Sequence, residues 1–260
     1  MSRKLLLTLL SATSIGGIAL ASGTASADLI GVNFVVQGTG TTGNSLSATS
    51  TAGYIPQENF NNIVSPTTLG QAAPLDFGPT SLVDSTGAAT NVSISGAFNN
   101  NYQTGTKPAS GPNYTLLYGE FKTGKSTSTA TKTSSVTLSG LGSGSYNLVV
   151  YTVTDFFEVT SVPGTFSVGS DSQTVLEQKG ANFNGTFVNA TSTTPGNYIE
   201  FTDLTPVNGD ITLNILAPTG SNVGVDGIQL QTVPEPASVG IFGAGAAGLM
   251  LLSRRRRALK

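Results

Sequence analysis

The chain has no cysteine, no histidine and no tryptophan, and only 10% of its 260 residues are charged. Without cysteine there is no disulfide framework and no thiol chemistry, so stability has to come from a hydrophobic core. Without histidine the chain lacks the commonest general base and metal ligand, which excludes Ser-His-Asp and Cys-His triads. A zinc site would have to use carboxylates alone, an uncommon ligand set for zinc.

The amino-terminal residues have the pattern of a targeting segment. Arg3 and Lys4 precede a short leucine-rich run, and small residues continue to the A-x-A pattern formed by Ala25 and Ala27. This order predicts a secretory signal peptide over residues 1–27, which signal peptidase removes so that the mature chain begins at Asp28. A weaker cleavage site at 19–21 and an uncleaved amino-terminal anchor are the alternatives.

The carboxyl-terminal residues have a second targeting pattern. Pro234, Glu235 and Pro236 precede sixteen uncharged residues, 237–252, and then a cluster of arginines. As a helix the uncharged run would rise about 24 Å, a little under the roughly 30 Å hydrocarbon core, which predicts one short transmembrane helix. Arginines favour the cytoplasmic side, so everything before Val233 should face outward. The cluster consists of Arg254, Arg255, Arg256 and Arg257.

This order of tripeptide, apolar helix and terminal arginines resembles the PEP-CTERM sorting signal of exported bacterial proteins. The resemblance covers residues 234–260, about a tenth of the chain. It implies a transient hold in the inner membrane, cleavage at the tripeptide by an exosortase-type enzyme, and delivery to the cell surface or extracellular matrix. An ordinary single-pass tail anchor, with Pro-Glu-Pro as a rigid linker, is the alternative.

Between the two segments, residues 28–233 are enough for one domain. They include five basic and thirteen acidic residues, a formal charge near −8, against −2 for the whole chain. So acidic a surface argues against nucleic acid and anionic lipid as partners. Gly, Ser, Thr and Asn are abundant and the apolar residues alternate in short runs, which is typical of an all-β protein with negligible helix.

The alternation predicts a series of short strands. The first has Ile30, Val32, Phe34 and Val36 on one face, and residues 38–53 that follow it have the composition of a loop or a poorly packed edge. The run 147–153 is apolar on both faces, as in a central strand, whereas the Thr/Ser tract 126–135 is expected to be a solvated edge or loop. Further strands are predicted at 91–98, 114–122, 156–162, 165–168, 173–177, 183–190, 198–202 and 211–216.

The last strand before the tail changes face. Val223 and Val225 lie on odd positions but Ile228 and Leu230 on even ones, so a β-bulge at Gly227 should absorb the shift. Residues 225–230 resemble the closing strand of galactose-binding-like modules, and residues 53–63 resemble a segment near the start of exported bacterial sandwich modules. With about eleven short strands, these features predict a two-sheet β-sandwich of jelly-roll or galactose-binding-like type.

Carboxylates are the only catalytic groups left to this domain. A glycoside hydrolase needs two of them about 5–10 Å apart across one bond. The candidate pairs are Asp155 with Glu158, Glu200 with Asp203, and Glu120 with Glu158 from different strands. The first two pairs are three residues apart, so on a strand they would point to opposite faces. Surface solvation is the simplest explanation of all of them, and we therefore expect no catalytic residue and no enzyme activity.

Aromatic residues are the candidates for ligand binding. Sugars stack their apolar faces on exposed rings while amides and carboxylates bind the hydroxyl groups. Tyr102, which ends an asparagine run, and the adjacent Phe156 and Phe157 are the residues of interest. Neighbouring residues of a strand point to opposite faces, so at least one phenylalanine should be exposed. Burial of these rings in the core is the alternative.

No organic cofactor is expected. Sandwiches of the resembled type often tie their first and last strands together with calcium, which implies a structural calcium ion at Asp226, shared with Asp28. A bulge at Gly227 would also turn backbone carbonyls toward such a hard cation. A solvated turn aspartate is the alternative.

Two function classes therefore lead. The first is a non-catalytic protein of the cell surface or extracellular matrix, and the second is a carbohydrate-binding module. A carboxylate glycoside hydrolase is a third. A solvent-facing aromatic cluster would favour carbohydrate binding, and a featureless polar surface would favour the purely structural role.

Overall fold

The computed structural model describes residues 28–37, 43–70, 74–124, 132–158 and 160–234. Both targeting segments therefore lie outside the described residues, apart from Asp28 and Pro234. The undescribed residues include the predicted cleavage residues Ala25 and Ala27 and the predicted transmembrane helix. They also include the sorting residues Glu235, Pro236 and 254–257. Within the described part, no helix is long and apolar enough to span a bilayer.

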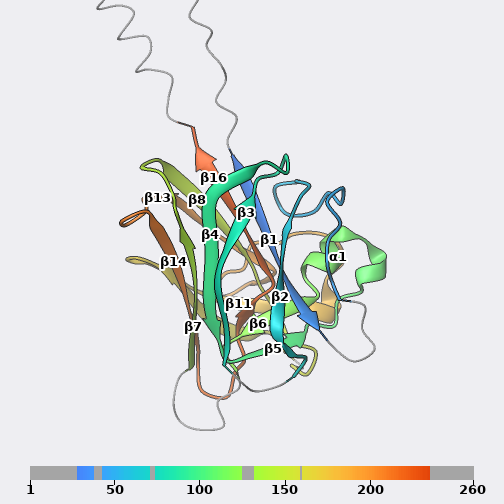
Figure 1. Ribbon diagram of the computed structural model, residues 1–260. Helices are drawn as coiled ribbons and strands as arrows, with labels where there is room; N and C mark the ends of the chain where they lie inside the picture. Colours follow the sequence, from blue (N-terminus) through green and yellow to red (C-terminus); the bar gives the residue numbers. More distant parts are fainter. Residues whose placement is uncertain (1–27, 38–42, 71–73, 125–131, 159, 235–260) are drawn as a thin grey trace, which may run out of the picture.

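The described chain is a β-sandwich, as the alternating pattern predicts (Figure 1). One sheet has five strands and the other has a seven-strand path joined by one further short strand. The first sheet runs β13 (Tyr198–Leu204), β8 (Ser145–Tyr151), β16 (Gly227–Val233), β1 (Leu29–Gln37) and β2 (Asn61–Thr68). The second runs β12 (Pro195–Gly196), β11 (Asp171–Lys179), β10 (Val162–Val168), β14 (Asp210–Ala217), β7 (Lys132–Ser139), β4 (Ala89–Phe98) and β3 (Leu75–Val83), with β9 (Val153–Thr154) paired to β11.

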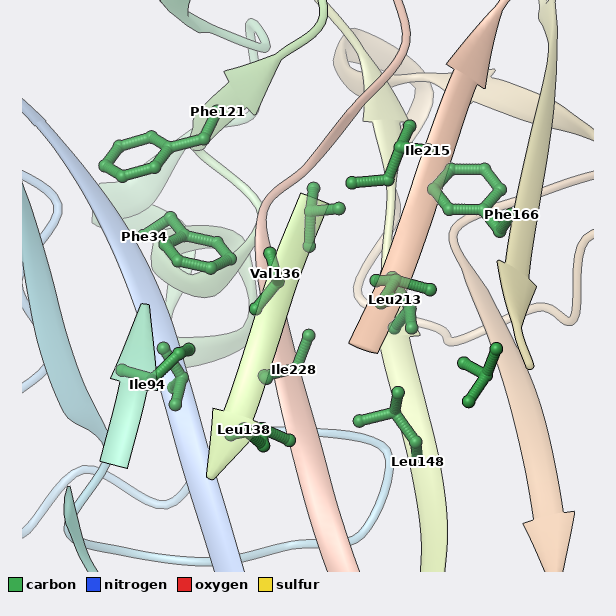
Figure 2. Packing of buried hydrophobic residues seen from close by; sticks show 14 of the residues in the cluster. Phe34, Ile94, Phe121, Val136, Leu138, Leu148, Phe166, Leu213, Ile215 and Ile228 are labelled. Atoms are coloured by element: carbon green, nitrogen blue, oxygen red, sulfur yellow. The ribbon is translucent and has the colours of Figure 1, made fainter. Parts of the chain in front are cut away.

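The core lies between the two sheets and is built from alternate residues of their strands (Figure 2). Phe34 of β1 packs against Phe77 of β3 and Phe98 of β4, with ring centroids 5.9 and 6.1 Å away. Leu148 of β8 lies near Leu213 of β14, and both are 1% exposed. The predicted alternation of β14 is thus confirmed, because its residues 211, 213 and 215 are buried while 214 and 216 are exposed. The predicted central strand is confirmed as well, since β8 pairs with both β13 and β16.

A third, small sheet closes one end of the sandwich. It consists of β5 (Asn100–Gln103), β6 (Gly119–Lys122) and β15 (Gly224–Val225). Phe121 of β6 belongs to the main core, where its ring stacks on Phe34 with centroids 4.8 Å apart. Because side chains alternate along a strand, its neighbours Glu120 and Lys122 point to the other face.

The ends of the described chain meet at the opposite end of the sandwich. β1 and β16 are antiparallel neighbours, and the Asp28 nitrogen donates a 2.8 Å hydrogen bond to the Thr232 hydroxyl. Figure 1 shows the start of β1 and the end of β16 at one end of the sandwich, while β5 and β6 lie at the other. Pro234, the exposed last described residue and the first of the sorting tail, therefore lies at the end remote from the small sheet.

The predicted change of face near the tail is present, but it is not a β-bulge within one strand. β15 pairs with β6 of the small sheet, Asp226 interrupts the strand, and β16 begins at Gly227 in the five-stranded sheet. The strand passes from one sheet to another at this point. A Cβ on Gly227 would lie 2.5 Å from the Val32 carbonyl oxygen, so only glycine fits there.

Residues 114–122 are only partly a strand, which corrects the prediction. A short helix, α1 (Pro112–Leu116), precedes β6, and a 3₁₀ turn, η1 (Pro108–Ser110), precedes α1. Gly111 adopts a φ of 138°, and Pro112 in the first turn has a φ already suited to a helix. The Thr115 hydroxyl donates to the Gly111 carbonyl at 3.2 Å, which holds the turn.

The predicted strand at 183–190 is also wrong. A 3₁₀ turn, η2 (Gly180–Asn182), leads instead into an irregular segment that covers the outer face of the five-stranded sheet. Its Phe183 joins Tyr151 and Leu116 in a second apolar cluster. Asn197 holds the segment in place, because its Oδ1 accepts the Val188 N–H at 2.9 Å.

The Gly- and Ser-rich stretches are better packed than their composition predicts. Residues 43–53 are mostly irregular, as expected, but the Asn44 side chain is buried and accepts the Val36 N–H at 3.0 Å. β7 includes residues 132–135, which the Thr/Ser composition assigns to an edge, and it pairs on both sides. β2 and β3 are not predicted because Pro66 and the Gly78-Pro79 pair have the pattern of strand breakers. Both lie where the strand register shifts, the position at which a sheet tolerates proline.

Candidate ligand site

Tyr102, Phe156 and Phe157, the three predicted ligand residues, come together at the small-sheet end of the sandwich. The rings of Tyr102 and Phe157 are 4.9 Å apart between centroids, and those of Phe156 and Phe157 are 5.7 Å apart. Phe156 is 52% exposed and Phe157 is 67% exposed. We call these three residues the aromatic platform. They are a solvent-facing cluster, so the core alternative is wrong for the two phenylalanines.

Both phenylalanines are exposed because they occupy a turn, not the predicted strand at 156–162. The Asp155 carboxylate causes the turn, since its Oδ1 accepts the N–H groups of Phe157 at 2.8 Å and Glu158 at 3.1 Å. The Phe156 N–H donates to the Gln103 carbonyl at 2.9 Å, which ties the turn to β5. The next strand, β10, begins only at Val162.

Small residues and polar groups surround the platform. A Cβ on Gly70 would lie 3.0 Å from the Tyr102 ring, and one on Gly105 would lie 3.0 Å from the Phe156 ring. Both glycines have positive φ, 77° and 83°, so larger residues there would be strained as well as crowded. Beside Tyr102 on β5, Gln103 accepts a 2.6 Å hydrogen bond from the half-buried Tyr118 hydroxyl.

A buried ion pair lies against the platform on its inner side. The Lys122 ammonium contacts Asp155 Oδ2, and the two side chains are 4% and 1% exposed. Lys122 Nζ also lies 5.0 Å from the centroid of the Tyr102 ring, within the range of a cation–π interaction. One charge pair therefore holds Tyr102 on one side and the turn of Phe156 and Phe157 on the other.

Three further carboxylates are completely buried next to this pair. Glu120, Glu177 and Asp226 are all 0% exposed, so surface solvation is the wrong explanation for Glu120, for Asp155 and for Asp226. Both oxygens of Glu120 lack a hydrogen-bond partner, as do Oε2 of Glu177 and Oδ1 of Asp226. We call these three residues the buried acid cluster. Lys122, the buried cation beside them, is already neutralised by Asp155.

Burial disfavours the charged form of these carboxyl groups. It raises the pKa of Glu120 and of Asp226 well above the ordinary carboxyl value, and it raises the pKa of Glu177 to about 8. Neighbouring carboxylates act in the same direction, while Lys122 partly opposes the rise in the pKa of Glu120. At neutral pH the cluster therefore holds protons in the absence of another cation.

The structure does not bring Asp28 and Asp226 together. Asp28 lies beside Thr232 at the tail end of β1, whereas the Asp226 carbonyl accepts the Phe34 N–H near the other end. Six residues of strand separate the two positions, roughly 20 Å. Across the described ranges, no group of three or more acidic, histidine or cysteine side chains is arranged to hold a metal ion. Calcium binding at Asp226 stays a prediction, without Asp28.

The residues of the candidate catalytic pairs lie in different environments. Asp155 is neutralised by Lys122. Glu120 has no exposed surface, and the nearby charge of Glu158 adds to the rise in its pKa. Glu200 is half-buried in β13, and Asp203 is exposed near its end with a φ of 54°.

Sequence reasoning missed Lys122 and Glu177. One signal was available: in β6 a glutamate and a lysine flank Phe121, so a charged face and a core face alternate on one strand. An ordinary edge strand with a solvated charged face has the same pattern. Only the burial of the charged face distinguishes such an edge from the strand seen here. What buries this face is the turn at 155–158 and β11, and both belong to parts of the chain far from β6 in sequence.

Fold and site define the class: a β-sandwich domain with an exposed aromatic platform at one end and the start of the carboxyl-terminal tail at the other. Residues 232–257 match the PEP-CTERM protein-sorting motif, which confirms the resemblance of the tail. The chain thus carries a signal for export and for sorting to the cell surface by an exosortase-type enzyme.

Comparison of the whole chain with known proteins gives no relative from which a function can be transferred. Among curated proteins, none matches this sequence. Among solved structures, the chain is similar to TmCBM61 in complex with β-1,4-galactotriose, at 11% identity and a TM-score of 0.25, over 54% of this chain and 81% of the other. That score is too low for any transfer of ligand or residue role.

Proposed function

We propose that this protein is a non-catalytic, exosortase-sorted surface protein whose sandwich, of galactose-binding-like or jelly-roll type, binds carbohydrate through the aromatic platform. The observation that carries the proposal is the platform itself. Two phenylalanine rings more than half exposed, beside a tyrosine, are costly to leave in water without a function.

The platform has the properties that sugar binding requires. Its rings present apolar faces for the C–H groups of a sugar, and the Tyr118–Gln103 pair supplies polar atoms nearby for hydroxyl groups. The buried ion pair and the turn hydrogen bonds fix the rings before a ligand arrives, so little conformational entropy is lost on binding.

A binding role without catalysis agrees with the state of the carboxylates. Glu120 and Glu177 have no exposed surface, and Asp155 already has a partner. None of these groups is available to protonate or attack a glycosidic bond next to the platform.

The position of the platform also suits a sorted protein. β16 begins beside the small sheet and ends at Val233, next to the tail. A domain held at its tail would present the platform away from the point of attachment, whether the hold is a membrane helix or a processed carboxyl end.

The platform variant F156A/F157A is expected to weaken glycan binding at least tenfold, because stacking is worth about 1 kcal/mol or more per ring. Its free energy of unfolding should change by less than about 1 kcal/mol, since both rings are largely solvated. A glycan array probed with the exported protein, alongside thermal melting, gives both quantities. Tyr54→Ala, which removes a 42% exposed ring elsewhere on the sandwich, is the matched control and should bind normally.

Cleavage of the tail is expected at or near Pro234-Glu235-Pro236. Both prolines forbid helix and ladder hydrogen bonds around the glutamate, so an enzyme meets an extended segment. Mass spectrometry of surface-extracted protein should find a carboxyl terminus there and no arginine cluster. Glu235→Ala is the control, expected to retain the tail. Finding residues 250–260 still attached to the native protein would favour a plain tail anchor.

A further inference from the structure

Every basic residue between residues 28 and 233 is a lysine, and the five are Lys107, Lys122, Lys125, Lys132 and Lys179. Four of them lie in the described ranges, and all four are at the platform end. Lys122 is the buried partner of Asp155. The other three are exposed or partly exposed and surround it.

Contacts of neighbouring residues place these three lysines. Lys179 pairs with Thr154, the residue before Asp155. Lys132 begins β7 next to Thr133, whose carbonyl accepts a 3.2 Å hydrogen bond from Asn99, and Asn99 in turn bonds the Lys122 carbonyl. Lys107 follows two residues after Gly105, the glycine against Phe156.

The exposed or partly exposed acidic residues gather mainly at the other end. Asp28 lies beside Thr232, and Asp84 is next to Ser85, whose N–H donates to the Leu29 carbonyl. Asp171, Asp203 and Asp210 line one groove between the β10–β11 hairpin and the start of β14. At the platform end the exposed or half-buried acids are Asp76 and Glu158.

The domain is therefore polarised: its tail end is acidic, and its small amount of positive charge is concentrated around the aromatic platform. We propose that the carbohydrate bound there is anionic, a glycan bearing carboxylate or sulfate groups. This inference rests on the proposed function. Lys122 does not contact the ligand's charge, because Asp155 already neutralises it; Lys107, Lys132 and Lys179 do.

An anionic glycan uses both features of this surface. The sugar rings stack on Phe156 and Phe157, while its charges meet lysines that are too few to attract a polyanion alone. The acidic tail end repels such a polymer more strongly than the platform end does, so electrostatics favours contact at the platform end. A neutral glycan would use the rings and gain nothing from the lysines.

Polygalacturonate and the same polymer fully methyl-esterified make the test, because esterification keeps the sugar backbone and replaces each carboxylate by a neutral methyl ester. The exported protein is expected to bind the charged form about tenfold more tightly at low salt, with the difference shrinking as added salt screens the lysines. The variant K107Q/K132Q/K179Q should bind both forms equally. F156A/F157A should lose both. Dextran sulfate in place of polygalacturonate shows whether sulfate is preferred to carboxylate.

If the native protein binds the two polymers with equal affinity and F156A/F157A binds neither, the inference is overturned and the proposed function stays intact. Binding of DNA as tight as that of polygalacturonate and unaffected by F156A/F157A would also overturn it, since the rings would then play no part. If the protein binds neither polymer, the inference fails. The proposed function fails with it only when neutral glycans on an array are not bound either.

Discussion

Replacing Lys122 by methionine is expected to lower the free energy of unfolding by about 3–5 kcal/mol, the usual cost of removing one partner of a buried ion pair. The loss is large because Asp155 would remain 1% exposed, without its counter-charge and beside three other buried carboxyl groups. Chemical denaturation at neutral pH measures it. Glycan affinity should fall together with stability, since the same pair holds Tyr102 and the turn of the platform.

Two variants make this result specific to the ion pair. Lys132→Met removes a partly exposed lysine and should change the unfolding free energy by no more than about 0.5 kcal/mol. In K122M/D155N the asparagine oxygen can still accept the turn hydrogen bonds, so most of the lost stability should return. A loss below about 1 kcal/mol for Lys122→Met alone would show that the pair is not buried as described.

Raising the pH from 5 to 9 is expected to destabilise the domain by several kcal/mol. Glu120, Glu177 and Asp226 have pKa values raised by burial, that of Glu177 to about 8, whereas the ordinary values of the unfolded chain are 4.5 for glutamate and 3.8 for aspartate. Between these limits the folded state holds protons that the unfolded state has released, so stability falls as pH rises. The stability that these protons contribute is complete below the unfolded-state pKa values and is lost as the pH rises through the folded-state pKa values. Each tenfold difference in proton affinity between the folded and unfolded states is worth about 1.4 kcal/mol.

Melting temperature as a function of pH tests this expectation. Glu177→Gln should flatten the decline between pH 5 and 9, while Asp203→Asn, which changes an exposed acid, should leave it unchanged. The same experiment tests the calcium ion predicted at Asp226, because a bound divalent cation would replace the protons. Millimolar calcium should then raise the melting temperature at pH 8, and an unchanged value removes calcium from the account. A melting temperature that rises steadily from pH 5 to 9 without calcium contradicts the proton-holding cluster.

The local sequence pattern predicted the strands whose buried faces contact only the core. Strands β8 and β14 and the change of face at Gly227 are visible in the sequence, because one or both faces of each strand contact the core and no other part of the chain alters the pattern. Elements that depend on specific side-chain bonds were missed or mistaken. The turn at residues 155–158 exists because Asp155 accepts two backbone N–H groups, and a period-two pattern takes the same residues for a strand.

The candidate site was predictable as a set of residues but not as a surface. Tyr102 and the two phenylalanines are more than fifty positions apart, and nothing local indicates that they meet. They do so because Lys122 of β6 reaches Asp155, an ion pair that connects the small sheet to the turn. The buried acid cluster was unpredictable for the same reason: a glutamate on a short polar strand indicates a solvated surface until distant segments cover it.

Binding of carbohydrate on the rings of Tyr102, Phe156 and Phe157 can be seen in a crystal structure of the exported protein with an oligosaccharide chosen from the glycan array. We expect a sugar ring stacked on Phe157 or Phe156, with hydroxyl groups near Gln103. A sugar bound elsewhere, for example against Tyr54 on the outer face of the five-stranded sheet, with the platform empty, would contradict it.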